Sequence, residues 1–275
     1  MAVKIPSRYL YSLFMWVLLV CFLSEQASAH VIKVGSKHTY KTIKKALLVA
    51  QPNDTVIVFE GVYQEGNIVI NKPIVFMGIN QPVLDGQSKF EILSVKANGV
   101  TINGFTIKNS GYATLDDPGG IKVYDSEHIT IENNILDNNF FGIYIQYGKH
   151  CIIKNNRIKA YGIEEQQIGN GIHCWKSDSL LIIGNNISGH RDGIYFEFVT
   201  GSVIWRNVSY QNIRYGLHFM FSNNDAYISN TFKNNGAGVA VMFTHKVKMI
   251  NNILIILIII SMMIIMMKMT QKKII

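Results

Sequence analysis

Short runs of alternating apolar and polar residues, each opened by a glycine, recur along the chain. The six clearest runs begin at Gly120, Gly142, Gly171, Gly193, Gly216 and Gly238. The intervals between these glycines are 22, 29, 22, 23 and 22 residues, and such a period is typical of stacked structural units. Alternation predicts strands, because successive side chains of a strand point to opposite faces.

An asparagine motif keeps step with the glycines, as in Ile131-Glu-Asn-Asn-Ile135 and Ile153-Lys-Asn-Asn-Arg157. Asparagine tolerates left-handed backbone and can form hydrogen-bonded ladders between stacked turns. One such unit cannot bury its apolar side alone, and no helical pattern lies between the runs. We therefore predict an all-β solenoid, a parallel β-helix whose strands pair with their counterparts in the next coil. The 29-residue interval predicts a loop inserted over 160–170.

The chain divides into three segments. Residues 1–29 have the features of a secretory signal peptide: basic Lys4 and Arg8, an apolar stretch, and small residues before the expected cleavage site. An uncleaved membrane anchor is the alternative. Residues 30–252 form the predicted β-helix domain. Residues 253–275 are an aberrant apolar low-complexity tail, for which we expect a frameshift or truncation near residue 252. Its apolar run, Ile253 to Met267, is shorter than the ~20 residues of a membrane-spanning helix.

The N-terminal part of the mature chain shows a different pattern. His30 to Lys37 is predicted as a strand. Thr39 to Val49 has Ile43, Ala46 and Leu47 at helical spacing, which predicts a short amphipathic helix. We expect this helix to cap the open end of the solenoid, since a bare end would expose both core and unpaired strand edge.

The formal net charge is +8, and three of the positive charges lie in the tail. The remaining body is only mildly basic and has no basic stripe, so we expect no nucleic-acid partner. Of the three cysteines, Cys151 and Cys174 would remain after signal cleavage. Both fall on inward positions of different strands, which predicts two buried thiols without a disulfide. A shared metal site is the alternative for this pair.

Side chains at the second and fourth positions after each glycine should line the outer face of the predicted coil. The second position is occupied by His218 in the fifth run, and the fourth by Met220 and Met242 in the last two. Neighbouring coils lie about 4.8 Å apart, so the two methionines should be adjacent with His218 beside them. Two thioethers and an imidazole suit Cu(I). An apolar docking patch is the alternative interpretation.

Other residues of these rows are candidates for partner binding, namely Trp175, Tyr195 and Glu197. Outward aromatic side chains can stack on sugar rings or contact a protein. Arg191-Asp192 and Arg214-Tyr215 precede two of the glycines, and we expect them to cap turns and form ion pairs between coils. Glu197 is the only carboxylate of the two outward rows, and we find no converging acids or nucleophile. The sequence therefore offers no recognisable catalytic constellation.

Two segments resemble known families. The opening of helix, Asn53-Asp54, buried strand and Gly61-Val-Tyr-Gln-Glu65 resembles pectin-lyase-like right-handed β-helices. The segments Arg214-Tyr-Gly-Leu-His-Phe-Met220 and Ala237-Gly-Val-Ala-Val-Met242 resemble the nitrous-oxide reductase maturation family NosD, and this resemblance covers about 30 to 252.

The NosD resemblance implies a periplasmic, non-enzymatic accessory protein. Its expected partners are an ABC-type ATPase and membrane permease, a copper chaperone lipoprotein, and nitrous-oxide reductase, whose copper centres the family helps to assemble. His218, Met220 and Met242 would then handle copper, as transiently bound Cu(I). Such proteins continue with further coils, which the segment from Ile253 does not match. A secreted polysaccharide-active or sugar-binding β-helix protein is the alternative function.

Overall fold

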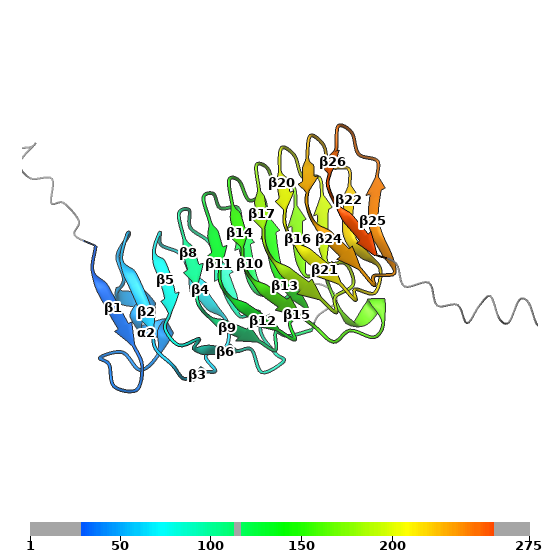
Figure 1. Ribbon diagram of the computed structural model, residues 1–275. Helices are drawn as coiled ribbons and strands as arrows, with labels where there is room; N and C mark the ends of the chain where they lie inside the picture. The colour runs from blue at the N-terminus through cyan, green and yellow to red at the C-terminus, as the bar shows by residue number, and fades with distance from the viewer. Residues whose placement is uncertain (1–28, 113–116, 256–275) are drawn as a thin grey trace, which may run out of the picture.

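The computed structural model describes residues 29–112 and 117–255, and it winds them into successive coils of short strands (Figure 1). Strands at equivalent places in successive coils pair in parallel and form three sheets along the solenoid. This is the predicted all-β, right-handed parallel β-helix. The expected signal peptide, apart from Ala29, and the tail beyond Ile255 lie outside the described residues.

Sheet A runs the whole length of the described solenoid and leads into the asparagine corners. Among the described residues it has ten strands: β1 (Val31–Val34), β2 (Thr55–Val58), β5 (Val75–Gly78), β8 (Thr101–Asn103), β11 (Thr130–Glu132), β14 (Ile152–Lys154), β17 (Leu181–Ile183), β20 (Val203–Trp205), β23 (Ala226–Ile228) and β26 (Lys248–Ile250). Parallel pairing in this sheet therefore begins with β1 and β2, well before the glycine runs that open at Gly120.

Sheet B follows each asparagine corner. Its nine described strands are β3 (Val62–Tyr63), β6 (Val83–Asp85), β9 (Thr106–Lys108), β12 (Ile135–Asp137), β15 (Arg157–Lys159), β18 (Asn186–Ser188), β21 (Val208–Tyr210), β24 (Thr231–Lys233) and β27 (Ile253–Ile255). Strand β27 pairs with β24, so the last described coil continues three residues beyond residue 252. The repeat pattern did not reveal this strand, because Ile253–Ile255 lacks polar alternation.

Sheet C carries the runs that follow the glycines. Its eight described strands are β4 (Ile68–Ile70), β7 (Leu93–Val95), β10 (Gly119–Tyr124), β13 (Phe141–Gln146), β16 (Ile172–Trp175), β19 (Ile194–Glu197), β22 (Tyr215–Met220) and β25 (Ala237–Met242). The first and third residues after each glycine from Gly120 to Gly216 are buried in one continuous apolar core, as the alternation predicts. Cys151 and Cys174 lie in this core as free thiols, and burial raises the pKa of Cys151 to about 11.

A ladder of buried asparagines holds the corner between sheets A and B. Its members are Asn134, Asn156, Asn185, Asn207 and Asn230. The main-chain N–H of Asn185 donates to Oδ1 of Asn207 at 2.9 Å, and Nδ2 of Asn207 donates back to the carbonyl of Ile182 at 2.9 Å. Each amide thus satisfies backbone groups that the turn leaves without strand partners.

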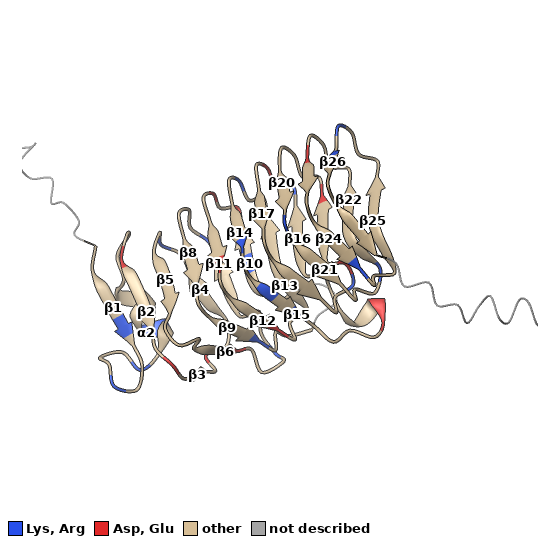
Figure 2. Ribbon diagram, in the orientation of Figure 1, with Lys and Arg blue, Asp and Glu red and all other residues tan. Residues whose placement is uncertain are grey.

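Charged side chains are scattered over the three sheets and their turns rather than gathered in one stripe (Figure 2). Opposite charges meet on neighbouring rungs of sheet A, where Lys154 Nζ lies 2.7 Å from Glu132 Oε2. A partly exposed pair of this kind contributes under about 1 kcal/mol. Ion pairs of this kind therefore contribute little to holding the coils together.

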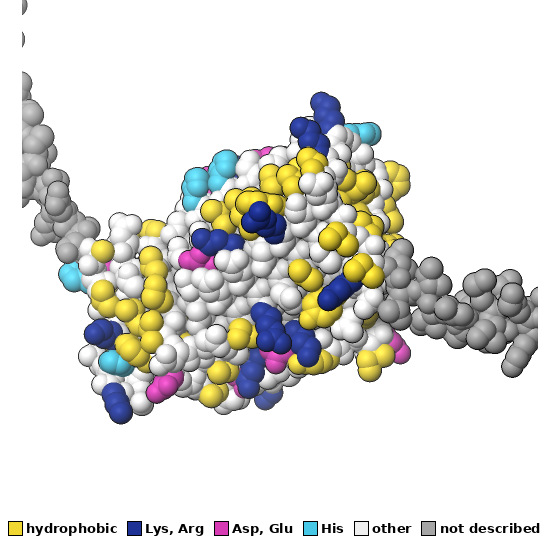
Figure 3. Space-filling view, in the orientation of Figure 1, with side chains coloured by type: hydrophobic (Ala, Val, Ile, Leu, Met, Phe, Trp, Pro, Cys, Tyr) yellow, Lys and Arg dark blue, Asp and Glu magenta, His cyan; other side chains and the backbone are white. Residues whose placement is uncertain are grey.

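No described residue covers the C-terminal end of the solenoid. Strands β25, β26 and β27 each stand at the edge of a sheet, and exposed apolar side chains include Val241, Met249 and Leu254. Apolar side chains gather at this end of the molecule in Figure 3. The N-terminal end is covered, so the two ends of the solenoid differ.

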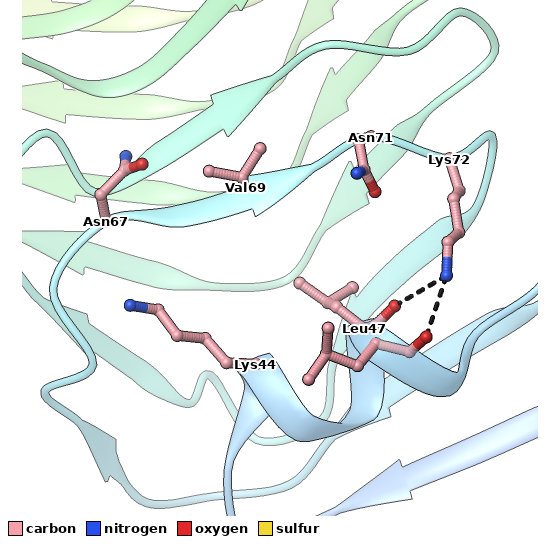
Figure 4. A pocket seen from close by; sticks show the side chains of 7 residues that line it. Lys44, Leu47, Asn67, Val69, Asn71 and Lys72 are labelled. Atoms are coloured by element: carbon pink, nitrogen blue, oxygen red, sulfur yellow. Dashed lines mark hydrogen bonds between the residues drawn. The ribbon is translucent and has the colours of Figure 1, made fainter.

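Helix α2 (Ile43–Val49) covers the N-terminal end and begins later than the predicted Thr39. Side chains from the first coils bind both of its ends. Glu65 accepts hydrogen bonds from the N–H groups of Ile43 and Lys44 at 2.7 and 3.0 Å. Lys72 donates to the carbonyls of Leu47 and Leu48 at 3.2 and 3.1 Å (Figure 4).

The motif Gly61-Val-Tyr-Gln-Glu65 accompanies a capping helix because its glutamate binds the first N–H groups of that helix. A carboxylate at a helix N-terminus and an ammonium at its C-terminus satisfy free backbone groups and oppose the helix dipole. Within the described ranges, no helix is both long and apolar enough to cross a membrane.

We expect Asn207→Ala to lower the free energy of unfolding by about 3 kcal/mol, because it leaves a buried N–H and a buried carbonyl without partners. Urea denaturation at 25 °C measures the change. Asn186→Ala is the matched control, since Asn186 is exposed on β18. Equal losses in the two variants would contradict a structural role for the ladder.

Lys72→Met should loosen helix α2 at a cost of about 1 kcal/mol, because the last carbonyls lose their cation. Amide hydrogen exchange reports this directly, through faster exchange of the Ala50 N–H that bonds to the Ala46 carbonyl. Lys45→Met, on the exposed side of the same helix, should leave that exchange rate unchanged.

Candidate functional site

Two rows of side chains run along the outer face of sheet C. The second-position row contains Lys122, Tyr144, His173, Tyr195 and His218, and the fourth-position row contains Tyr124, Gln146, Trp175, Glu197, Met220 and Met242. The pairing register places Met220 directly beside Met242. The predicted adjacency of the two thioethers is therefore present, and His218 lies two residues before Met220 on the same strand and face.

The second-position row is buried, although it lies outside the solenoid core. His218 is 3% exposed and His173 is 7% exposed, so the expectation of open surface positions is wrong for this row. The reason is that rings on successive rungs cover one another. His173 stacks on Tyr144 with 4.5 Å between ring centroids, and Tyr195 lies 4.6 Å from His218.

His218 is held by a buried carboxylate from the neighbouring coil. Its Nδ1 lies 3.3 Å from Oδ2 of Asp192, which is itself fully enclosed. The other oxygen of Asp192 lies 3.4 Å from Nε of Arg214, the inter-coil ion pair predicted for these residues. A carboxylate accepts hydrogen bonds, so Nδ1 of neutral His218 carries the proton and Nε2 carries the lone pair.

The lone pair on His218 has no partner. Nε2 is buried and makes no hydrogen bond to any residue that the structure describes. A buried nitrogen acceptor without a partner normally costs about 1–3 kcal/mol. A histidine whose Nδ1–H is fixed by a carboxylate and whose Nε2 is free has the arrangement of a metal ligand.

His173, two rungs away, takes the opposite tautomer. Asn170 donates from Nδ2 to Nδ1 of His173 at 3.3 Å, since its oxygen already accepts from Arg191 and from the Asp192 N–H. Nε2 of His173 therefore carries the proton; it lies 3.9 Å from Oε2 of Glu197, too far for a hydrogen bond, and has no hydrogen-bond partner among the described residues. Burial, aided by Arg191 and Lys122, lowers the pKa of His173 to about 3. This imidazole is a neutral donor and cannot bind a metal through Nε2 in this state.

The methionine pair is the more accessible part of the cluster. Both side chains are half-buried, and the Tyr195 hydroxyl donates to Sδ of Met220 at 3.3 Å. Burial raises the pKa of Tyr195 to about 12, so this hydroxyl keeps its proton at neutral pH. Across the described residues, no three His, Cys, Asp or Glu side chains converge as metal ligands. Any metal bound at His218 would depend on the thioethers.

The partner-binding candidates differ in exposure. Trp175 and Glu197 are half-buried, whereas Tyr195 is buried and contacts His218 and Met220. Beside the fourth-position row stands an exposed row of phenylalanines that sequence reasoning missed: Phe198, Phe221 and Phe243. All three have φ between 50° and 55°, a left-handed conformation that is costly for a bulky residue. Their rings stack 5.0 Å apart.

Asp192 and Asn170 were also missed as groups that set the chemistry of the histidines. Each directly precedes a repeat glycine, and that shared position was the available signal. The sequence could not show that Asp192 reaches across to the next coil while Asn170 reaches His173 in its own coil. The inserted segment also contributes, because Glu165 Oε2 lies 3.6 Å from Arg214 Nη1.

Comparison with known proteins identifies a family and two relatives that match part of the chain. The family model described as "Right handed beta helix region" matches residues 87–254. A "Probable ABC transporter binding protein NosD" from Pseudomonas aeruginosa is 29% identical over 130 residues, which is 46% of this chain and 30% of that protein. The protein of the same description from Stutzerimonas stutzeri is 28% identical over 135 residues, 48% of this chain and 31% of the relative. The matched region thus spans less than a third of these relatives.

Solved structures share the architecture at low identity. The alginate lyase from Paenibacillus sp. str. FPU-7 superimposes with a TM-score of 0.60 and 16% identity, covering 82% of this chain and 98% of that one. At this identity the likeness shows the fold alone.

Burial of His173 should make the protein less stable in mild acid. The folded state keeps this imidazole neutral down to a pKa of about 3, whereas the unfolded chain protonates it near 6.5. The unfolded state therefore binds the extra proton, and stability falls by about 1.4 kcal/mol per pH unit between pH 6 and 4 from this group. Urea denaturation of His173→Gln should show a correspondingly shallower fall; parallel curves for the two proteins would contradict the assignment.

Proposed function

Because the chain belongs to the right-handed β-helix family, we propose that it is a periplasmic accessory protein that accepts Cu(I) and helps to deliver it to the copper centres of nitrous-oxide reductase. Among the functions of β-helix proteins, the two relatives described as NosD favour this one. The observation that carries the proposal is that the register sets Met220 beside Met242, on the same strand face as His218, whose Nε2 has no hydrogen-bond partner among the described residues.

The donor set favours Cu(I) over harder ions. Thioether sulfur is a soft ligand that selects Cu(I), and neutral imidazole is compatible with it. Asp192 supports the imidazole from behind, which fixes its orientation and raises its basicity. The cluster has no carboxylate or thiolate ligand of its own, so a bound Cu(I) keeps its positive charge. Such a site suits an ion that is passed on.

Transfer requires contact with other proteins, and the exposed phenylalanine row supplies an apolar surface for it. Phe221 and Phe243 directly follow Met220 and Met242, and Phe243 is 70% exposed. A copper chaperone lipoprotein that docks here would bring its ion beside the sulfurs. The printed description of the relatives as ABC transporter binding proteins supports an ABC-type ATPase and permease as further partners. Nitrous-oxide reductase would be the recipient.

We propose a non-enzymatic role for this site. His173 Nε2 lies 3.9 Å from Glu197 Oε2 without a hydrogen bond, and the imidazole is buried and held neutral. The Tyr195 hydroxyl donates its hydrogen bond to the sulfur of Met220 and not to a group that would face a substrate. The polar groups of the rows therefore fix the cluster in place.

Anaerobic titration with Cu(I) against a chromophoric chelator tests the proposal on the purified full chain. Met220→Leu with Met242→Leu should weaken Cu(I) binding at least tenfold, because leucine keeps the volume and removes the sulfur ligands. Met249→Leu is the matched control, since Met249 is an exposed methionine on sheet A. No Cu(I) binding by the parent chain, or equal binding by the double variant, would exclude this cluster as a copper site.

A further inference from the structure

The outer face of sheet A changes from polar to apolar partway along the solenoid. In its three-residue strands the middle side chain enters the core, and the first and third point outward. On β8 and β11 the outward residues are polar: Thr101, Asn103, Thr130 and Glu132. From β14 to β23 all but Lys154 are apolar, and these seven form the sheet A apolar patch: Ile152, Leu181, Ile183, Val203, Trp205, Ala226 and Ile228.

No described element covers this patch. Trp205 is 36% exposed, and the other six side chains are half-buried by their neighbours on the sheet. Helix α2 packs against β1, β2 and β4 at the N-terminal end, and the inserted segment 160–170 lies between a strand of sheet B and a strand of sheet C. A contiguous apolar patch on the outside of a folded protein is a common mark of an interaction site.

Two cations flank the patch and keep their charge. Arg206 directly follows Trp205 and lies over its ring, with Cζ 4.5 Å from the ring centroid. A cation–π contact of this kind leaves the positive charge in place. Lys248 continues the first-position row on β26, beside Ala226, and is exposed. Neither cation takes part in an ion pair among the described residues.

Acidic side chains are missing from the same part of the sheet. The segments 181–184, 203–206 and 226–229 form β17, β20, β23 and the turn residue after each, and they contain no Asp or Glu. The acid that borders the patch, Glu132 on β11, lies 2.7 Å from the ammonium of Lys154, which balances its charge. The face is therefore complementary to a partner that is both apolar and negatively charged.

The size of the patch distinguishes between the candidate partners. Four strands of three residues, ~4.8 Å apart, give an area on the order of 200 Å². A stable protein interface buries about 800 Å² on each side, so the patch is too small to hold a second copy of this chain. A lipid bilayer requires no matching shape. Tryptophan favours the headgroup level of a bilayer, and arginine pairs well with phosphate oxygens.

We propose that the sheet A apolar patch binds the surface of an anionic phospholipid membrane, with Trp205 among the headgroups and Arg206 and Lys248 on lipid phosphates. Binding of this kind combines buried apolar area with attraction of cations to anionic lipids. It is weak and reversible because the patch is small, and it weakens as salt is added. The inference does not depend on the copper proposal, because Met220 and Met242 lie on sheet C.

Co-sedimentation of the full chain with lipid vesicles tests the assignment. Vesicles of equal parts phosphatidylglycerol and phosphatidylcholine supply the anionic surface, and pure phosphatidylcholine vesicles are the neutral reference. We expect binding to the anionic vesicles to be at least about fivefold tighter at low salt, because two unpaired cations face the membrane. Added sodium chloride should reduce this difference.

Two double variants separate the apolar contribution from the charged one. Val203→Thr with Trp205→Asn gives β20 the outward residue types that β8 carries in the same rows, so the strand is expected to fold. This variant should bind anionic vesicles at least about fivefold more weakly. Arg206→Gln with Lys248→Gln should weaken binding by a similar factor and remove most of its salt dependence. Far-UV circular dichroism checks that both variants are folded.

Tyr210→Ala with Lys233→Gln is the matched control. Lys233 Nζ also lies over an aromatic ring, 5.2 Å from the Tyr210 centroid, but this pair stands on sheet B. The control removes one ring and one charge from the chain, as the patch variants do, and it should bind anionic vesicles like the parent.

Three outcomes would overturn the proposal. One is absence of binding to anionic vesicles by the parent chain. Another is equal binding by the parent and both patch variants, which would place the membrane contact elsewhere in the chain. The last is self-association of the parent in sedimentation velocity that Val203→Thr with Trp205→Asn abolishes, which would make the patch a contact between two copies.

Discussion

The in-register parallel pairing of successive coils is the constraint on which the rest of the structure depends. Each strand pairs through hydrogen bonds with strands of the coils before and after it. Each side-chain position therefore recurs about 4.8 Å further along the solenoid axis. The asparagine ladder makes this register obligatory, because the Asn207 amide fits only when its own coil and its neighbours are aligned. Residues more than twenty positions apart, such as Met220 and Met242, become neighbours as a direct result.

That same register explains how far the sequence could predict the molecule. The fold, the inward apolar positions, the free buried cysteines and the adjacency of the two methionines all follow from a period and an alternation, which are visible in the letters. Burial of the outer row does not follow from them. It depends on ring stacking, such as Tyr144 on His173, and therefore on side-chain conformations that alternation leaves undetermined.

The two histidines of the outer row show how one structural position can carry different chemistry. His173 and His218 occupy equivalent strand positions, yet an amide holds the first and a carboxylate holds the second. The amide donates and leaves a proton on Nε2, whereas the carboxylate accepts and leaves a lone pair there. The group at Nδ1 thus decides which imidazole has a lone pair on Nε2: Asn170 of the same coil for His173, and Asp192 of the preceding coil for His218. A repeat protein can in this way give equivalent positions of different coils separate chemistry.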